Sequence, residues 1–133
     1  MRPDQTLSSW KITFSHAFSG MAYIFRTEKS MRVHLGLAAA ALLLLALLQA
    51  SWLEWAIIII VIGMVISAEI LNTAIEVMVD LYCPYYHPLA KISKDVSAAG
   101  VLVTAIVSIL VGCIVFLPHL WKLVTAIIYK TSD

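Results

Sequence analysis

Three long apolar stretches constrain this chain more than any other feature of its sequence. The shortest of them, residues 33–49, gives a helix about 26 Å long, just enough to cross a hydrocarbon core of about 30 Å. Hydrophobic residues make up 62% of the 133 residues and charged residues 13%, about half the charged share of a soluble domain. The sequence therefore predicts an all-α integral membrane protein with three transmembrane helices.

The N-terminal segment has a helical pattern but is too polar to span a bilayer. Apolar residues recur at intervals of three and four from Leu7 to Phe25, and Ser, Thr and Lys fill most positions between them. A helix with one apolar and one polar face lies in the plane of the membrane interface. We therefore expect one membrane domain over residues 1–133, made of an amphipathic surface helix over 7–27 and transmembrane helices over 33–50, 52–82 and 94–117.

A polar stripe interrupts the second apolar stretch. It consists of Glu69, Asn72, Thr73, Glu76 and Asp80. At about 100° per residue, these five positions fall within one sector of about 100° on a helix. Moving an unpaired acidic side chain into hydrocarbon costs about 2.5–3.5 kcal/mol on insertion scales, so such residues usually mark a function. The stripe is therefore the first candidate for a functional site.

The rise of a helix predicts how deep each member of the stripe lies. If Trp52 sits at one membrane interface, Glu69 lies about 26 Å along the helix, still inside the opposite leaflet. Glu76 lies about 36 Å along, at or just outside the opposite interface. The stripe therefore straddles a membrane surface, which suits chemistry between a lipid headgroup and a water-soluble partner.

The distribution of basic residues predicts the orientation. Short segments on one side of the membrane carry an excess of Lys and Arg, and by the positive-inside rule they lie in the cytoplasm. The residues concerned are Arg26, Lys29, Arg32, Lys91 and Lys94. The stripe then faces the cytoplasm. The formal net charge of +1 excludes a nucleic-acid binder that works by electrostatics.

The chemistry of the predicted cytoplasmic cluster suits phosphoryl transfer. Paired carboxylates at a wet interface are good Mg²⁺ ligands, because this ion takes one or two carboxylates plus phosphate oxygens and water. A lysine such as Lys94 is suited to neutralise charge on a transferred phosphoryl group. Glu69, which lies deeper, is suited to act as a base toward a buried hydroxyl. The glycine-rich and catalytic-loop motifs of soluble kinases are absent from the sequence.

Other interpretations of the same residues remain open at this point. Glu76 and Asp80 fit ordinary headgroup-level charges, and Glu28, taken alone, fits a solvated ion pair with its basic neighbours. His34 shows no metal-ligand spacing and fits an interfacial or structural role. A small transporter or channel subunit that uses Glu69 as an ion site is the alternative from another functional class. Such proteins place charge near the midplane, in repeated segments, and neither feature is present here.

The residues of the stripe and of the following loop resemble a family signature. Residues 69–76 (Glu-Ile-Leu-Asn-Thr-Ala-Ile-Glu), Asp80, the pair Lys94-Asp95 and the pair Ala98-Ala99 are similar to the signature of the small bacterial membrane diacylglycerol and undecaprenol kinases. The resemblance implies a lipid kinase that uses ATP and Mg²⁺. It also implies a homotrimer of three-span protomers in the bacterial cytoplasmic membrane, with active sites shared between neighbours.

The resemblance also implies roles for individual residues. Glu69 becomes the general base on the lipid hydroxyl, and Asn72 orients the base and the acceptor. Glu28 and Glu76 become the ligands of the metal ions that bridge the ATP phosphates. This assignment replaces the ion-pair interpretation of Glu28.

The same resemblance implies a nucleotide end of the site and a substrate. Lys94 and Asp95 bind the nucleotide, and Asp80 supports them at that end. Residues 32–34 (Arg-Val-His) and 87–91 (His-Pro-Leu-Ala-Lys) look more like the Gram-positive undecaprenol kinase branch. The predicted acceptor is therefore undecaprenol, and the alternative is diacylglycerol.

Overall fold

The computed structural model describes the backbone of residues 3–130 and the side chains of residues 10–128. Within this range the chain forms four helices, α1 (Pro3–Thr27), α2 (Lys29–Leu47), α3 (Trp52–Tyr82) and α4 (Pro88–Lys130). In length and composition, α2, α3 and α4 are each able to cross a membrane. The all-α class and the three helices able to span a bilayer are therefore confirmed.

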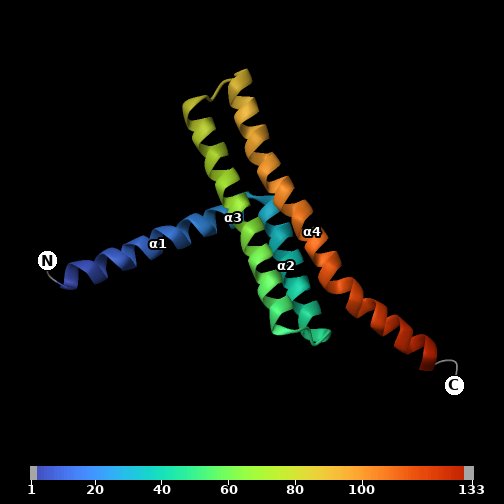
Figure 1. Cartoon of the computed structure of the whole chain (residues 1–133). Coiled ribbons are helices and arrows are strands. Elements are labelled where there is room, and N and C mark those ends of the chain that lie inside the picture. The colour runs from blue at the N-terminus through green and yellow to red at the C-terminus, as the bar shows by residue number, and fades with distance from the viewer. Residues whose placement is uncertain (1–2, 131–133) are drawn as a thin grey trace.

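The three long helices lie side by side, and α1 projects away from them (Figure 1). Helix α3 packs against both α2 and α4, so it forms the centre of the bundle. The buried apolar core between the helices is small and includes Leu45, Ile58 and Val115, one from each of α2, α3 and α4. Most other apolar side chains of the bundle point outward, as expected for helices that face lipid.

The connection between α2 and α3 is a tight turn that ends one helix and starts the next. Gln49 adopts a positive φ of 51°, and the N–H groups of Gln49 and Ala50 bond to the carbonyls of Ala46 and Leu45. This pattern is a Schellman motif, which satisfies the last carbonyls of α2. Ser51 then caps α3: its hydroxyl accepts the N–H of Glu54, and the Glu54 carboxylate accepts the N–H of Ser51.

Glu54 also connects this turn to α4. Its Oε1 lies 2.8 Å from Nε2 of His119, whereas its Oε2 accepts the Ser51 N–H at 2.7 Å. One carboxylate therefore closes the capping box of α3 and fastens α4 to the end of the bundle formed by the α2–α3 turn. This is the end of the bundle opposite the α3–α4 loop.

Helix α4 is longer than the transmembrane segment predicted over residues 94–117. At its start, Pro88 fits the first turn because its missing N–H has no intrahelical partner there. Nδ1 of His87 accepts the N–H of Leu89 at 3.2 Å and caps the same turn. At the other end, the helix continues through Pro118 to Lys130, because one lost backbone bond is tolerated when neighbouring contacts hold the chain. The contact of His119 with Glu54 is such a contact.

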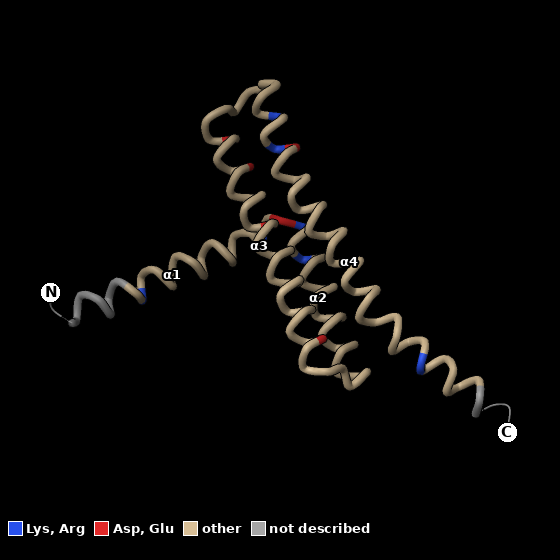
Figure 2. Tube along the Cα trace, viewed as in Figure 1, with Lys and Arg blue, Asp and Glu red and all other residues tan. Residues whose placement is uncertain are grey.

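The charged residues divide the bundle into two halves. In Figure 2 most acidic and basic residues lie between the α1–α2 corner and the α3–α4 loop, and the opposite half of the bundle carries few. Helices α3 and α4 continue past the start of α2 in the charged half (Figure 1). The fold therefore brings the polar stripe of α3 next to the corner where α1 meets α2.

We predict that Ser51→Ala destabilises the bundle. The substitution removes both the side-chain acceptor for the Glu54 N–H and the Ser51 hydroxyl that donates to the Glu54 carboxylate at 2.8 Å. Loss of an N-cap costs about 1 kcal/mol, so the unfolding midpoint in detergent should fall measurably. The matched control is Ser19→Ala, since the Ser19 hydroxyl only donates to a carbonyl one turn earlier in its own helix. An equal loss in both variants would contradict the importance of this cap.

Candidate functional site

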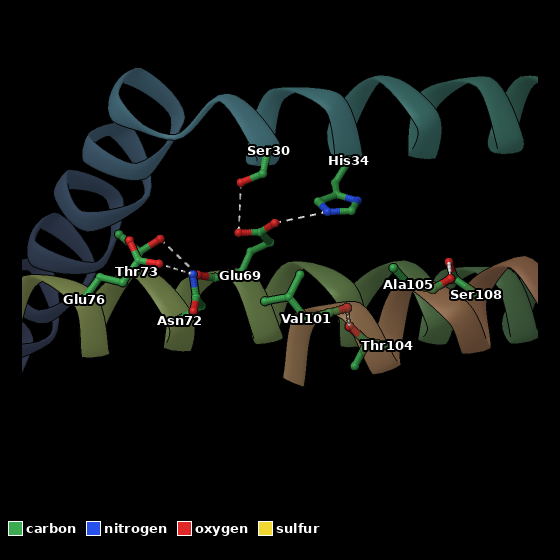
Figure 3. Close-up of polar contacts among 10 residues, drawn as sticks. All are labelled: Ser30, His34, Glu69, Asn72, Thr73, Glu76, Val101, Thr104, Ala105 and Ser108. Atoms are coloured by element: carbon green, nitrogen blue, oxygen red, sulfur yellow. Dashed lines mark hydrogen bonds and ion pairs between the residues drawn. The ribbon is translucent and has the colours of Figure 1, made fainter. Parts of the chain in front are cut away.

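Glu69 is a buried acidic side chain near the middle of α3. Its exposed fraction is 3%, and α2 covers it. The Ser30 hydroxyl donates to Glu69 Oε2 at 3.1 Å, and His34 Nε2 lies 3.1 Å from Glu69 Oε1 (Figure 3). Each carboxylate oxygen thus has its own partner, which offsets the cost of burying a charge. The general base that the sequence predicts is therefore held in place from α2.

The spacing of Ser30 and His34 explains how one helix reaches both oxygens. Positions four apart in a helix lie one above the other on the same face. That face of α2 points toward α3 in Figure 3. Thr73, one turn beyond Glu69, is also buried, but its hydroxyl donates to the backbone carbonyl of Glu69 at 3.0 Å. The Thr73 hydroxyl is therefore satisfied within its own helix, and the carboxylate is left to the α2 side chains.

Asn72 and Glu76 form a second polar group on the same stripe. Asn72 Nδ2 donates to Glu76 Oε1 at 2.9 Å, and the Ser97 hydroxyl lies 2.7 Å from Asn72 Oδ1. An ionised carboxylate only accepts, so the amide must turn its NH₂ to Glu76 and its oxygen to Ser97. The same hydroxyl lies 2.9 Å from the Lys94 carbonyl in its own helix. Helix α4 thereby fixes the orientation of the amide, and the amide fixes Glu76.

The exposed end of the stripe carries two ion pairs. Lys94 Nζ lies 2.5 Å from Asp80 Oδ1, and Lys91 Nζ lies 2.5 Å from Asp95 Oδ2. The first pair joins the end of α3 to the start of α4, and the second lies within one turn of α4. Exposed pairs of this kind contribute only about 0–1 kcal/mol. Breaking either pair therefore costs little stability when its lysine contacts an anionic ligand instead.

Glu28 is the single residue between α1 and α2. Its backbone is extended, with φ −90° and ψ 117°, and its side chain makes no capping hydrogen bond. The Arg32 guanidinium holds this corner by donating to the carbonyls of Phe25 and Arg26 at 3.3 and 3.1 Å. Among the side chains of residues 10–128, Glu28 has no ion-pair partner, so the interpretation as a solvated ion pair is wrong. Its carboxylate is left available for a ligand.

The carboxylates fit an incomplete metal site better than a closed one. Within the described residues, no group of three or more His, Cys, Asp and Glu side chains is close enough to hold a metal ion unaided. Glu76 engages one oxygen with Asn72, and the structure gives its other oxygen no partner among the described residues. Mg²⁺ typically takes one or two carboxylates and completes its shell with phosphate oxygens and water. The Glu28 and Glu76 carboxylates, which the sequence predicts as metal ligands, are donors of the type that this ion takes.

The sequence analysis missed four residues that position the predicted ones. They are Ser30, Arg32, His34 and Ser97. The sequence pattern predicts an interfacial or structural role for His34 and a role in membrane orientation for Arg32, and both residues also belong to the resemblance over residues 32–34. The sequence contains one indication of the contacts with Glu69. Ser30 and His34 are polar, lie four residues apart at the start of α2, and are at about the depth of Glu69. Nothing in the sequence predicts the contacts of Ser97, because they depend on how α4 is rotated about its axis.

Two apolar hollows lie beside the polar groups. The larger, about 790 Å³, lies between α1 and α3 and is lined among others by Gly20, Ile24, Ile70 and Val77. Thr73 also lines it, so it reaches the turn of α3 that follows Glu69. The smaller, about 230 Å³, lies between α2, α3 and α4.

Comparison with known proteins gives one consistent result. The sequence model of the family described as prokaryotic diacylglycerol kinase matches residues 15–116. The chain is 44% identical over 108 residues to the undecaprenol kinase of Bacillus subtilis, which covers 81% of this chain and 88% of that protein.

Relatives of lower identity are named diacylglycerol kinases. The diacylglycerol kinase of Synechocystis is 36% identical over 113 residues, covering 84% of this chain and 65% of that protein. The diacylglycerol kinase of Escherichia coli is 37% identical over 81 residues, covering 57% of this chain and 66% of that protein. The chain therefore spans about two thirds of the length of these two relatives.

Proposed function

The chain belongs to the prokaryotic diacylglycerol kinase family, and from this premise we propose that it transfers the γ-phosphoryl group of ATP to the hydroxyl of a membrane lipid alcohol. The observation that carries the proposal is the buried Glu69 carboxylate, held from α2 by Ser30 and His34. A second carboxylate, Glu76, lies two turns nearer the exposed end of the same stripe. The family assignment replaces the alternative of a transporter or channel with Glu69 as its ion site.

We propose undecaprenol as the acceptor. The support is the similarity to a protein named undecaprenol kinase, which extends over 88% of that relative. The matches to proteins named diacylglycerol kinase are lower in identity and cover less of those proteins. Diacylglycerol is the second candidate, since both acceptors are long-chain lipids with a primary hydroxyl at their polar end.

In the proposed reaction, Glu69 accepts the proton of the lipid hydroxyl. The lipid oxygen then forms a bond to the γ-phosphorus, the bond from that phosphorus to the β–γ bridging oxygen breaks, and ADP leaves with the electron pair. When a carboxylate is shielded from water, few water molecules compete with the lipid hydroxyl for hydrogen bonds to it. The apolar hollow between α1 and α3 reaches Thr73 and offers the lipid chain a place beside this base.

The other polar residues are proposed to handle the nucleotide. Glu28 and Glu76 hold Mg²⁺, which supplies charge stabilisation to the phosphate oxygens when it is bound. Asn72 keeps Glu76 in place and orients base and acceptor. Lys94 and Asp95 bind ATP, and Asp80, which pairs with Lys94, supports it at the nucleotide end of the site.

We propose the following placement in the membrane. The α1–α2 corner and the α3–α4 loop face the cytoplasm, on the argument from basic residues. Helix α1 lies on that surface through its apolar face, as predicted for residues 7–27. The protein is a homotrimer in the bacterial cytoplasmic membrane with sites shared between neighbours. The homotrimer rests on the family resemblance. A face of small residues on α4 suits close helix packing, and two of them, Ser108 and Gly112, line the hollow between α2, α3 and α4 within the protomer.

The direct test is a transfer assay with purified protein in mixed micelles. The protein is given γ-labelled ATP, Mg²⁺ and equal mole fractions of undecaprenol and diacylglycerol, and the labelled lipids are separated. We expect label mainly in undecaprenyl phosphate. Label mainly in phosphatidic acid would overturn the choice of acceptor alone. Folded protein that labels neither lipid would overturn the kinase proposal.

We predict that Glu69→Gln abolishes turnover and leaves ATP binding intact. Glutamine keeps the size of the side chain but cannot take up the hydroxyl proton, and a general base contributes about 10²- to 10⁴-fold. The rate constant kcat is measured with saturating lipid, and ATP binding by calorimetry. The matched control is Glu54→Gln, because Glu54 lies in the same helix and also pairs with a histidine. A Glu69→Gln variant that loses ATP affinity would contradict the assignment as base.

We predict the opposite pattern for Glu76→Gln. Removing this negative charge weakens the attraction for the metal, so the KM for MgATP and the Mg²⁺ requirement should rise about ten- to a hundredfold. The measurement is initial rate against Mg²⁺ concentration at fixed ATP, again with Glu54→Gln for comparison. An unchanged Mg²⁺ requirement would rule out Glu76 as a ligand.

A further inference from the structure

The contacts of Glu69 assign a task to α2 that the proposed reaction does not yet use. Ser30 Oγ and His34 Nε2 each lie 3.1 Å from a different oxygen of the carboxylate (Figure 3). Among the described residues, no Lys or Arg forms an ion pair with Glu69. The base is therefore held by two polar groups that carry no fixed positive charge.

The chemistry of these groups fixes the direction of both hydrogen bonds. An ionised carboxylate accepts and cannot donate, so Ser30 donates its hydroxyl proton and His34 carries a proton on Nε2. Each carboxylate oxygen has about two lone-pair positions, so one position on each remains free for the lipid hydroxyl. A lysine or arginine in the same place would neutralise the charge that has to attract the proton.

The position of His34 adds a steric argument. Its side chain is 21% exposed, and it lines one end of the 230 Å³ hollow between α2, α3 and α4. Apart from Ser108, the other residues that line this hollow are apolar and include Ala38, Ile62 and Phe116. The imidazole therefore contacts the Glu69 carboxylate and also borders the hollow, which Glu69 itself does not line. Hydrogen bonding and packing act here through the same ring.

We propose that Ser30 and His34 are positioning residues for phosphoryl transfer, which hold the Glu69 carboxylate aimed at the lipid hydroxyl. This inference rests on the proposed function of Glu69 as base. A misaimed base costs rate without costing nucleotide affinity, because orientation acts on the chemical step. His34 contributes more than Ser30, since it both donates and fills space.

The first test is a split between kcat and KM in three variants. We expect His34→Ala to lower kcat about 10- to 100-fold, the range for one hydrogen bond to a charged group, with the KM for ATP changed less than about threefold. His34→Gln keeps a donor of similar reach and should recover most of that loss. Ser30→Ala should lower kcat about three- to tenfold.

The matched control is His119→Ala. His119 Nε2 also faces a glutamate oxygen, at 2.8 Å from Glu54, but at the opposite end of the bundle. This variant removes the same kind of contact and should keep kcat within about twofold. An equal kcat loss in His119→Ala and His34→Ala would assign the effect to bundle stability and overturn the proposal. Failure of His34→Gln to recover activity would do the same for the donor role.

The second test asks whether His34 acts through Glu69. In a Glu69→Gln background there is no base left to aim, so adding His34→Ala should change the residual rate less than about twofold. A further loss as large as in the parent protein would show that the imidazole acts independently and would overturn the proposal. A parent protein that labels no lipid would overturn the kinase itself, whereas an active parent with an unaffected His34→Ala variant would overturn the positioning role alone.

Discussion

A carboxylate buried between membrane helices must have both oxygens satisfied, and the rest of this structure depends on that requirement. Ser30 and His34 meet it from α2, which fixes the rotation of α2 relative to α3. The first turn of α2 must then lie beside the middle of α3, and Arg32 holds the corner with α1 at that level. Glu28 is brought to the same region as a consequence. One buried charge thus sets where three helices meet.

The remaining stripe is organised from the other side of α3. Ser97 on α4 turns the Asn72 amide, and the amide holds Glu76, so this carboxylate is fixed by α4 whereas Glu69 is fixed by α2. The two carboxylates lie about 10 Å apart along the helix. They therefore have separate supports and separate depths, and this separation underlies our proposal that one serves the lipid and the other the metal and nucleotide. Asp80 and Lys94 extend the series into solvent.

The sequence predicts the parts of this architecture that depend on local pattern. Hydrophobic length predicts helices able to span a bilayer, and helical periodicity places Glu69, Asn72 and Glu76 on one face. The sequence does not predict the partners of these residues. Ser30, His34 and Ser97 contact the stripe only because of how α2 and α4 are rotated against α3. Neighbourhood in the sequence also suggests a wrong contact for Glu28. This residue sits between basic residues but has no ion-pair partner within the described side chains. Pro118, a usual helix breaker, lies within α4.

The central claim, that the stripe crosses a membrane surface with Glu69 inside and Glu76 at the wet edge, is open to a direct measurement of depth. Spin labels at Leu71 and Met78, both exposed side chains of α3, report collisions with oxygen and with a water-soluble nickel chelate in lipid bilayers. The account predicts a label at position 71 that is accessible to oxygen and protected from the chelate, and a label at 78 with the reverse preference. Equal chelate accessibility at both positions would contradict it.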